Sequence, residues 1–328
     1  MVNETLHSQG TIAHCLLSFK SRLTPHTATP SLDAQVLLAH LTGQSRAWLL
    51  AHPETPLSSA QQQKLEEAVT QLENGLPLPY LLGEWEFFGL KFKVTPDTLI
   101  PRPETELLVE TALKWIREQF LTQRRKEKRK DRKEIIEKTS LCPSRDLGAL
   151  RGENFPDLVQ AADIGTGTGC IAVSLAVHCP ELHLVATDLS PAALAVARHN
   201  AQTHRVADRI TFLEADLLPP NLQPSTFNLI CANLPYIPTA TLHALDVYGR
   251  EPTLALDGGP DGLTYIRRLL SLAASRLAPG GLMLLEIEAT QGQLVKALAH
   301  PYFPSARIIV RTDLAGHDRL FIVQTPAN

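Results

Sequence analysis

The chain has 328 residues, of which 44% are hydrophobic and 20% charged, and its formal net charge at pH 7 is −3. These values exclude a disordered or fibrous chain and leave enough apolar residues for one large core or two smaller ones. The small net charge does not favour nucleic acid or an anionic membrane as the main partner. No apolar run approaches the roughly 18 residues of a membrane-spanning helix. The five cysteines form no CxxC pair, which argues against a metal site and fits a reducing compartment.

The N-terminal part of the chain predicts a small helical domain over residues 1–83. Apolar residues recur there at helical spacing, and Gly75, Pro77 and Pro79 then end helix formation. In residues 84–100, aromatic and β-branched residues lie on either side of Gly89, which predicts a β-hairpin that links this domain to the rest of the chain. A further helix is expected over residues 104–120.

The composition changes abruptly after residue 121. Residues 124–138 hold nine basic and four acidic side chains, and few large apolar residues follow up to residue 157. We interpret residues 122–157 as a charged, flexible insertion into a domain that spans residues 101–328. A surface insertion without a function is the simpler interpretation, and a weak electrostatic contact with RNA or the ribosome is the alternative.

From residue 158 onward, short apolar strands alternate with helices, which is typical of a parallel sheet with helices on both faces. The pattern predicts helices over 170–177, 191–202 and 265–277, and strands over 158–164, 182–187, 210–213, 227–232, 282–287, 307–310 and 320–324. The last two strands are too close in sequence for a helical crossover, so they should be antiparallel. The sequence therefore predicts an α/β protein with a Rossmann-like, seven-stranded, mostly parallel sheet whose last strand is antiparallel.

A glycine-rich loop joins the first of these strands to the next helix, and it consists of Gly165, Thr166, Gly167, Thr168 and Gly169. Its glycines allow a ligand to approach the backbone N–H groups at the start of the helix. Asp188 ends the second strand 23 residues after Gly165, where a carboxylate can accept hydrogen bonds from a ribose diol. Because the spacing is neither that of a dinucleotide loop nor that of a P-loop, a nucleoside without a pyrophosphate fits best.

The fourth strand runs directly into Asn233, Leu234, Pro235 and Tyr236. In open α/β sheets, ligands bind at the carboxyl ends of the strands. The Asn233 side chain and a nearby backbone carbonyl can accept both hydrogens of a planar –NH2 group, and the ring of Tyr236 can stack on that group. Two such acceptors favour a pyramidal nitrogen whose lone pair points toward an electrophile such as a methyl sulfonium. Positioning of this kind could supply roughly 7–11 kcal/mol at the favourable limit.

These residues resemble those of S-adenosylmethionine-dependent methyltransferases that act on planar nitrogen. Further segments resemble peptide chain release factor glutamine methyltransferases of the PrmC/HemK type: GLPLPYLLGEWEFFG (75–89), IPRPETE (100–106), EPTLALDGGPDG (251–262) and DLAGHDR (313–319). The resemblance covers nearly the whole chain except residues 122–157. It implies methyl transfer from S-adenosylmethionine to N5 of the glutamine in the Gly-Gly-Gln motif of class I release factors, by a cytoplasmic, monomeric enzyme.

The resemblance also implies roles for individual residues. The loop Gly165 to Gly169 and Asp188 would hold the cofactor, Leu217 would flank its adenine, and Asn233 would contact both ligands. Residues 233–236 would bind the substrate glutamine, with Asn233, Pro235 and Tyr236 as the catalytic residues. The N-terminal helices would bind the release factor, and no metal is implied.

One residue departs from the family pattern, and it keeps other functions open. The family usually has Asn-Pro-Pro-Tyr, whereas this chain has Leu234 as the second residue, which keeps the backbone carbonyl but loses the fixed φ of proline. Asn-Leu-Pro-Tyr also resembles the dimethyladenosine transferases of ribosomal RNA. The alternatives are therefore a ribosomal-protein glutamine methyltransferase, an adenine-N6 methyltransferase of RNA or DNA, and a cofactor-binding module without catalysis.

Overall fold

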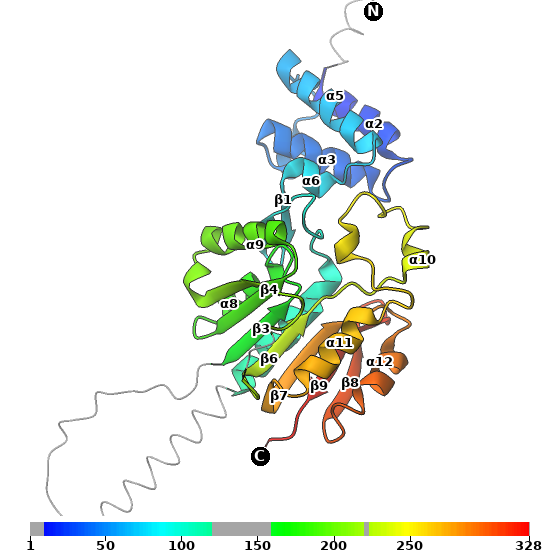
Figure 1. Ribbon diagram of the computed structural model, residues 1–328. Coiled ribbons are helices and arrows are strands. Elements are labelled where there is room, and N and C mark those ends of the chain that lie inside the picture. Colours follow the sequence, from blue (N-terminus) through cyan, green and yellow to red (C-terminus); the bar gives the residue numbers. More distant parts are fainter. Residues whose placement is uncertain (1–9, 120–158, 220–222, 328) are drawn as a thin grey trace, which may run out of the picture.

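The structure is a computed structural model that describes residues 10–119, 159–219 and 223–327. A helical region forms one end of the molecule, a hairpin follows it, and a large sheet with helices on both faces forms the other end (Figure 1). The predicted insertion, residues 122–157, lies outside the described residues. Among the helices of the described segments, none combines the length and the apolarity that crossing a membrane requires.

Three helices of the helical region begin with a side chain that caps the first turn. Thr11 and Ser45 each accept a hydrogen bond from a backbone N–H of the helix that follows, and Ser58 and Gln61 form a reciprocal capping box. The helices of this region are α2 (Ile12–Leu23), α3 (Pro30–Thr42), α4 (Arg46–Ala51), α5 (Ser59–Glu73) and α6 (Leu78–Leu82). Their buried leucines form a core of their own, and Arg22 on α2 pairs with Glu73 on α5 across it.

The predicted hairpin is confirmed. Strands β1 (Glu84–Phe87) and β2 (Leu90–Lys93) pair antiparallel, with Trp85 opposite Phe92. Phe88 and Gly89 connect them, and both residues have positive φ angles, as a tight turn with the right-handed twist of a hairpin requires. The buried rings of Phe87 and Phe92 join the core of the sheet domain, so the hairpin packs against that domain rather than standing free.

The predicted sheet is also confirmed, with seven strands in the order β5-β4-β3-β6-β7-β9-β8. Its strands are β3 (Gln160–Ile164), β4 (His183–Asp188), β5 (Ile210–Glu214), β6 (Phe227–Ala232), β7 (Leu277–Glu286), β8 (Arg307–Thr312) and β9 (Asp318–Gln324). Neighbouring strands from β5 to β7 are parallel, and β9 lies antiparallel between β7 and β8. The fold is thus Rossmann-like with an antiparallel last strand.

Successive residues of the central strands enter two different cores. Ala161 and Leu229 face one core with α8 (Cys170–His178) and the helix over 106–119, whereas Ala162 and Ile230 face the other with α11 (Thr264–Ala273) and α12 (Gly292–Ala299). Because side chains alternate along a strand, a strand that is apolar at every position must be covered on both faces. This requirement explains why helices lie on both sides of the sheet (Figure 1).

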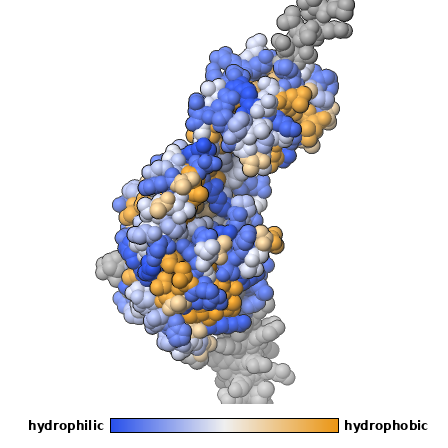
Figure 2. All heavy atoms as spheres, turned by 90° about the vertical axis from the view of Figure 1, so that its right-hand side faces the viewer, coloured by the Kyte–Doolittle hydropathy of each residue, from blue (hydrophilic) through white to orange (hydrophobic). Residues whose placement is uncertain are grey.

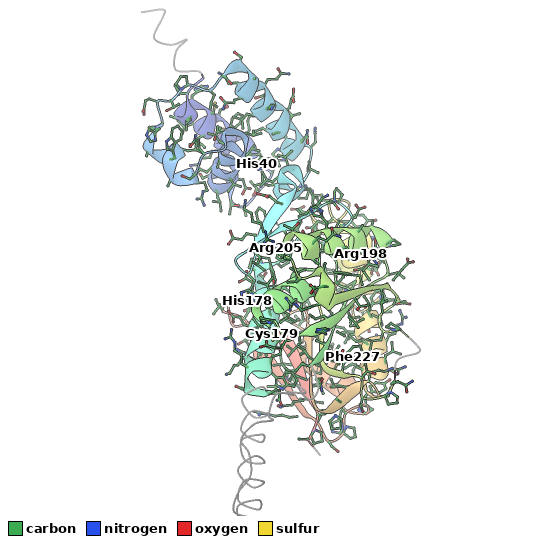
Figure 3. All side chains as sticks on the ribbon, turned by 90° about the vertical axis from the view of Figure 1, so that its left-hand side faces the viewer. His40, His178, Cys179, Arg198, Arg205 and Phe227 are labelled. Atoms are coloured by element: carbon green, nitrogen blue, oxygen red, sulfur yellow. The ribbon has the colours of Figure 1, made fainter. Side chains whose placement is uncertain are left out.

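The strands run with their carboxyl ends toward the helical region. Phe227, the first residue of β6, lies farther from that region than Arg198 and Arg205, which lie on and just after α9 (Pro191–Thr203) (Figure 3). The loops that follow β3, β4 and β6 therefore open on the side of the hairpin and the N-terminal helices. This is the edge at which open α/β sheets bind their ligands.

Most predicted boundaries differ from the structure by one or two residues and two differ by more, and three α-helices of the described residues were not predicted. The helix expected over 265–277 ends at Ala273, and β7 begins at Leu277 rather than at residue 282. Gly280 and Gly281 break the apolar pattern there, but the strand continues through them with an irregular register against β6. One unpredicted helix is α6, where helix formation was expected to end at Pro79; that proline lies in the first turn, where a missing N–H is tolerated. The others are α10 (Thr239–Leu242), a single turn, and α12, which begins at Gly292 without a side-chain cap.

Candidate active site

The glycine loop is held in place by hydrogen bonds from both sides. The Thr187 carbonyl on β4 accepts from the N–H groups of Gly165 (2.9 Å) and Thr166 (2.8 Å). Asp163, which is fully buried, accepts from the Thr166 hydroxyl at 2.6 Å and from the Ala172 N–H at 3.1 Å. Burial raises the pKa of Asp163 to about 7. The two hydrogen bonds lower this pKa and the charge of Asp188 raises it, and both effects are smaller than that of burial. These hydrogen bonds fix the backbone of the loop between β3, β4 and α8.

Two glycines of the loop are required by local geometry. Gly169 begins α8 with φ of +79°, and a Cβ there would lie 3.1 Å from the Cβ of Ala197 on α9. Gly165 has φ of +70°, and its Cβ would lie 3.1 Å from a methyl group of Leu234. At both positions the backbone is left-handed and a neighbouring atom lies close. A side chain would therefore be disfavoured both by the backbone conformation and by the lack of space.

Asp188 lies at the end of β4 and turns its carboxylate toward the loop. One oxygen accepts from the N–H of Gly167 and the other from the N–H of Ser190, each at 2.9 Å. Burial raises the pKa of this carboxyl, while the backbone N–H groups of Ser190, Gly167 and Leu189 act in the opposite direction. A carboxylate offers about four lone-pair sites, so Asp188 keeps acceptor capacity for a ligand after these contacts.

Leu217 is buried and has a positive φ of 66°. Its backbone carbonyl accepts a hydrogen bond from the Thr187 hydroxyl at 2.8 Å. A non-glycine residue rarely adopts this backbone region, and the bond to the buried Thr187 helps to hold it there. Leu217 lines a cavity together with residues of the glycine loop.

A cavity of about 320 Å³ lies between these elements, at the carboxyl ends of the central strands. Its volume is at the lower end of the range for small-molecule sites, which is roughly 300–1,000 Å³. The predicted residues that line it are Gly165, Thr166, Gly167, Thr168, Asp188, Leu217, Asn233, Leu234 and Pro235. Gly169 and Tyr236 do not line it, although Cys170 and Ile171, which follow Gly169 in the first turn of α8, do.

A second, smaller cavity of about 140 Å³ adjoins the first. Tyr236 lines only this one, whereas Asn233 and Leu234 line both, together with Leu99, Arg102 and Ala255. No described residue donates a hydrogen bond to the side-chain oxygen of Asn233 or to the backbone carbonyl of Leu234. Two acceptors without a described donor therefore belong to residues that line both cavities.

Two buried residues that the sequence did not reveal support this segment. The Asn233 side-chain nitrogen donates to the hydroxyl of Thr105 at 3.1 Å, and that hydroxyl donates to Glu286 at 2.6 Å. The Tyr236 hydroxyl donates to the other carboxylate oxygen of Glu286 at 3.1 Å. An acidic residue at the end of the apolar run 282–285 was the only local signal for Glu286. Nothing near Thr105 in the sequence indicates its partner.

The loop over residues 251–262 contributes to the lining of both cavities. Glu251 is buried, forms an ion pair with Arg102 and accepts a hydrogen bond from the N–H of Ile100 at 3.1 Å. It thereby connects this loop to the 100–106 segment. Farther along, Gln291 donates to the backbone carbonyls of Tyr236 (2.9 Å) and Gly262 (3.3 Å). Segments that are far apart in the sequence are thus hydrogen-bonded to one another around the two cavities.

Known proteins that are similar to this chain identify the class of protein to which it belongs. The catalytic domain of hMettl16, solved with the MAT2A 3′UTR hairpin 6, is 12% identical and shares the fold, with a TM-score of 0.50 and coverage of 83% of each chain. Residues 161–247 match the family model described as a methyltransferase domain, and residues 14–83 match the one described as the PrmC N-terminal domain. The sheet order and the match to the methyltransferase domain define the chain as a methyltransferase.

Its relatives define the family. The release factor glutamine methyltransferase of Moorella thermoacetica is 41% identical over 294 residues, which are 89% of this chain and 90% of that protein. The protein of the same name from Bordetella pertussis is 37% identical over 292 residues, with coverage of 89% and 93%. The chain belongs to the release factor glutamine methyltransferase family.

Proposed function

We propose that this enzyme transfers a methyl group from S-adenosylmethionine to the side-chain nitrogen N5 of the glutamine in the Gly-Gly-Gln motif of class I peptide chain release factors. Family membership supports the reaction. The observation that carries it at the level of residues is Asn233, which lies where the two cavities meet with its amide oxygen unpaired. The larger cavity would hold the cofactor and the smaller one the glutamine side chain.

The larger cavity fits the chemistry of the cofactor. Asp188 keeps acceptor capacity for a ribose diol, Leu217 offers an apolar wall for a purine, and the glycine loop leaves room for close approach to its backbone. We infer that Gly165 to Gly169, Asp188, Leu217 and Asn233 hold S-adenosylmethionine. When bound, this cofactor supplies an electrophilic methyl group on a sulfonium and leaves as a neutral thioether.

The task of the protein is then to make an amide nitrogen nucleophilic. The lone pair of an amide nitrogen is delocalised into the carbonyl, so the ground-state amide is a poor nucleophile. The Asn233 oxygen and the Leu234 carbonyl would each accept one N–H of the substrate, which favours a pyramidal nitrogen with its lone pair free. The N–C bond would form as the S–C bond breaks, and the methylated nitrogen would then release its excess proton to water. Contacts of this kind strengthen as the transition state forms and therefore raise kcat.

Residues 233–236 would bind the substrate as a unit. Pro235 lines the larger cavity and fixes the turn, and Tyr236 lines the smaller one, where its ring can stack on the planar amide. The bond from the Tyr236 hydroxyl to Glu286 orients that ring. Leu234 would contribute its backbone carbonyl to the substrate and its side chain to the packing on Gly165.

The helical region would bind the release factor. Leu17 on α2 and Leu50 on α4 expose more than half of their side-chain surface, and Leu32 on α3 is exposed as well. Apolar side chains gather on the face of this region that Figure 2 shows. We retain the predicted division into a recognition domain (1–83), a hairpin linker (84–100) and a methyltransferase domain (101–328) as part of this proposal.

The proposal also includes a monomeric enzyme of the cytoplasm. In support of a reducing compartment, Cys15, Cys170, Cys179 and Cys231 are buried and unpaired in the described residues. A weak contact of the basic stretch in 122–157 with RNA or the ribosome stays an open part of the proposal.

One labelling experiment tests the function. The enzyme is incubated with methyl-labelled S-adenosylmethionine and, separately, with a class I release factor, ribosomal proteins, ribosomal RNA and DNA. We expect label in the release factor, and we expect it to disappear when the glutamine of the Gly-Gly-Gln motif is changed to alanine. Label in RNA or DNA alone, or in a ribosomal protein alone, would overturn the proposal.

A further inference from the structure

Thr105 lies between the proposed catalytic amide and a buried carboxylate. Its hydroxyl oxygen is 3.1 Å from the side-chain nitrogen of Asn233 and 2.6 Å from one oxygen of Glu286. Thr105 and Glu286 are each only 2% exposed. Thr105 also lines the larger cavity, so the contact occurs at the edge of the site and away from bulk water.

Sheet register brings the carboxylate to this place. Ala232 at the end of β6 pairs with Leu285 on β7, so the next residues along the two strands, Asn233 and Glu286, are level with each other. Thr105 comes from a different part of the chain, the short 3-10 helix Pro103–Thr105. Three separate elements therefore converge on one chain of hydrogen bonds.

The number of protons in this chain sets its direction. An ionised carboxylate can only accept hydrogen bonds, and a hydroxyl has one proton to donate. Thr105 uses its proton on Glu286, which leaves only lone pairs for Asn233. Asn233 must then present its –NH2 group to Thr105, and its oxygen must face the other way, toward the cavities.

The orientation of the Asn233 side chain decides whether its amide oxygen can accept a hydrogen bond from the substrate amide. An Asn233 oxygen that faces the smaller cavity accepts an N–H from the substrate amide. The flipped side chain would place –NH2 against –NH2, with donors on both sides and no acceptor. The nitrogen and oxygen of an asparagine have almost the same shape, so packing alone does not distinguish the two orientations.

We propose that Thr105 and Glu286 are positioning residues that fix the side-chain amide of Asn233 with its oxygen toward the substrate amide. This inference rests on the proposed function, because it assigns a direction to a contact that methyl transfer to an amide needs. Glu286 also binds the hydroxyl of Tyr236, so one carboxylate orients both polar side chains of residues 233–236.

The direction of this chain of hydrogen bonds depends on the negative charge of Glu286. Burial raises the pKa of this carboxyl, whereas the hydroxyls of Thr105 and Tyr236 and the charge of Arg319 favour its ionised form, and Glu104 opposes it. A protonated carboxyl could donate to Thr105. The threonine proton would then be free to reach the oxygen of Asn233 and reverse the chain.

A pair of substitutions at residue 105 separates polarity from packing. Thr105→Val keeps the shape and removes the hydroxyl, and Thr105→Ser keeps the hydroxyl and removes a methyl group. Single-turnover and steady-state labelling of a release factor are measured for both, with melting temperatures. Thr325→Val is the matched control, because its hydroxyl donates to the Ala278 carbonyl at the opposite edge of the sheet.

We expect Thr105→Val to lower kcat by about 10²-fold, because a misaligned reactant typically costs that much. The KM for S-adenosylmethionine should stay within about twofold, since the loss concerns the reacting step. Thr105→Ser should recover kcat to within about fivefold of the wild type, and Thr325→Val should keep the wild-type kcat. Glu286→Gln, whose –NH2 can donate to Thr105, should show the same loss of kcat and decides the matter if Thr105→Val does not fold.

Failure of the proposed function and failure of the positioning role give different results. If the wild type does not label the release factor, the proposed function is wrong, whatever the variants do. If the wild type labels it while Thr105→Val and Glu286→Gln both keep kcat within about threefold, the positioning role is wrong and the function stands. Equal losses in Thr105→Ser and Thr105→Val would also overturn it, because hydroxyl polarity would then not be the cause.

Discussion

The side chain of Asn200 hydrogen-bonds both backbone groups of Lys93. Its nitrogen donates to the Lys93 carbonyl at 3.0 Å, and its oxygen accepts from the Lys93 N–H at 2.8 Å. The same nitrogen donates to the Thr168 carbonyl in the glycine loop at 2.8 Å. One buried amide on α9 thus joins the hairpin strand β2 to the proposed cofactor loop.

We predict that Asn200→Ala destabilises the protein and weakens cofactor binding. The change leaves the buried Thr168 carbonyl and two partly buried backbone groups of Lys93 without these partners, which we expect to cost about 1–3 kcal/mol of unfolding free energy. Chemical denaturation and calorimetric titration with S-adenosylmethionine measure the two effects. The control is Asn228→Ala, which removes a single bond to the Gln160 N–H at the other end of the sheet. Equal effects of the two substitutions would contradict the linking role of Asn200.

A second prediction concerns Asn233 itself. Asn233→Ala should lower the single-turnover rate of methyl transfer by about 10²-fold or more, since it removes a preorganised polar contact to the reacting group. The affinity for S-adenosylmethionine should largely survive, because Asp188 and the glycine loop remain. Rapid-quench labelling and calorimetry measure the two quantities. Near-normal transfer in this variant would remove Asn233 from the mechanism.

The sequence predicted much of this site because its signals are local. Gly165 to Gly169 and Asp188 end consecutive strands, and Asn233 follows directly on the apolar run of β6, so strand periodicity alone placed them at one edge. Thr105 and Glu286 are 181 residues apart in sequence. Their contact depends on the register of β6 against β7 and on how the 103–105 turn packs, neither of which a single sequence encodes locally.

The incorrect predictions about helices and strands have a similar origin. Leu277 was assigned to a helix because it continues the apolar pattern of α11, but it pairs with Phe227 in the sheet. Gly280 was expected to precede the strand, yet its N–H donates to the Pro326 carbonyl near the end of the chain. Long-range pairing therefore overrode a local preference in both cases. α12 was missed because it has no capping side chain and begins with a glycine.

Asp163 gives a prediction about stability and pH. Burial raises its pKa from 3.8 to about 7, so the folded protein binds a proton that the unfolded chain has already lost. The free energy of unfolding contributed by this group is highest below its unfolded pKa and falls as pH rises toward about 7. One of its carboxylate oxygens has no hydrogen-bond partner among the described residues, which agrees with a disfavoured charge.

The test compares the wild type with Asp163→Asn in urea unfolding from pH 4 to pH 8. We expect the difference in stability between the two proteins to shift in favour of the variant as pH rises through this range, because asparagine does not titrate. A difference that is constant with pH would show that Asp163 titrates alike in the folded and unfolded states.

Glu286 gives a prediction about activity and pH. Burial raises its pKa above 4.5, against the hydroxyls of Thr105 and Tyr236 and the charge of Arg319, and Glu104 and the nearby Cys170 also face it. As pH falls, protonation should reverse the hydrogen-bond chain, so kcat should decline through an acid limb centred above 4.5. The kcat–pH profile of Glu286→Gln should lack this limb. An identical limb in the variant would assign it to another group.

Leu234 provides a prediction about the departure from the family pattern. Its side chain is 4% exposed and packs against Gly165. Leu234→Ala should destabilise the protein by about 2–4 kcal/mol and weaken cofactor binding, because it opens a cavity beside the loop. Leu234→Pro should retain turnover to within about fivefold, since it keeps the backbone carbonyl and fixes φ. Denaturation and kinetic assays on both variants measure these outcomes, and an inactive, folded Leu234→Pro would show that this chain depends on leucine.

The position of β9 has a consequence for biosynthesis. β9 lies between β7 and β8, so β7 has no neighbour on its outer side, and β8 has no strand to pair with, until residues 318–324 have been made. While the ribosome is still translating the chain, β7 presents an open edge next to the nascent catalytic pocket, and such edges invite pairing with other chains. Premature termination before residue 318 would therefore yield an aggregation-prone product rather than a shortened enzyme, and Glu286 would have no completed sheet to hold it.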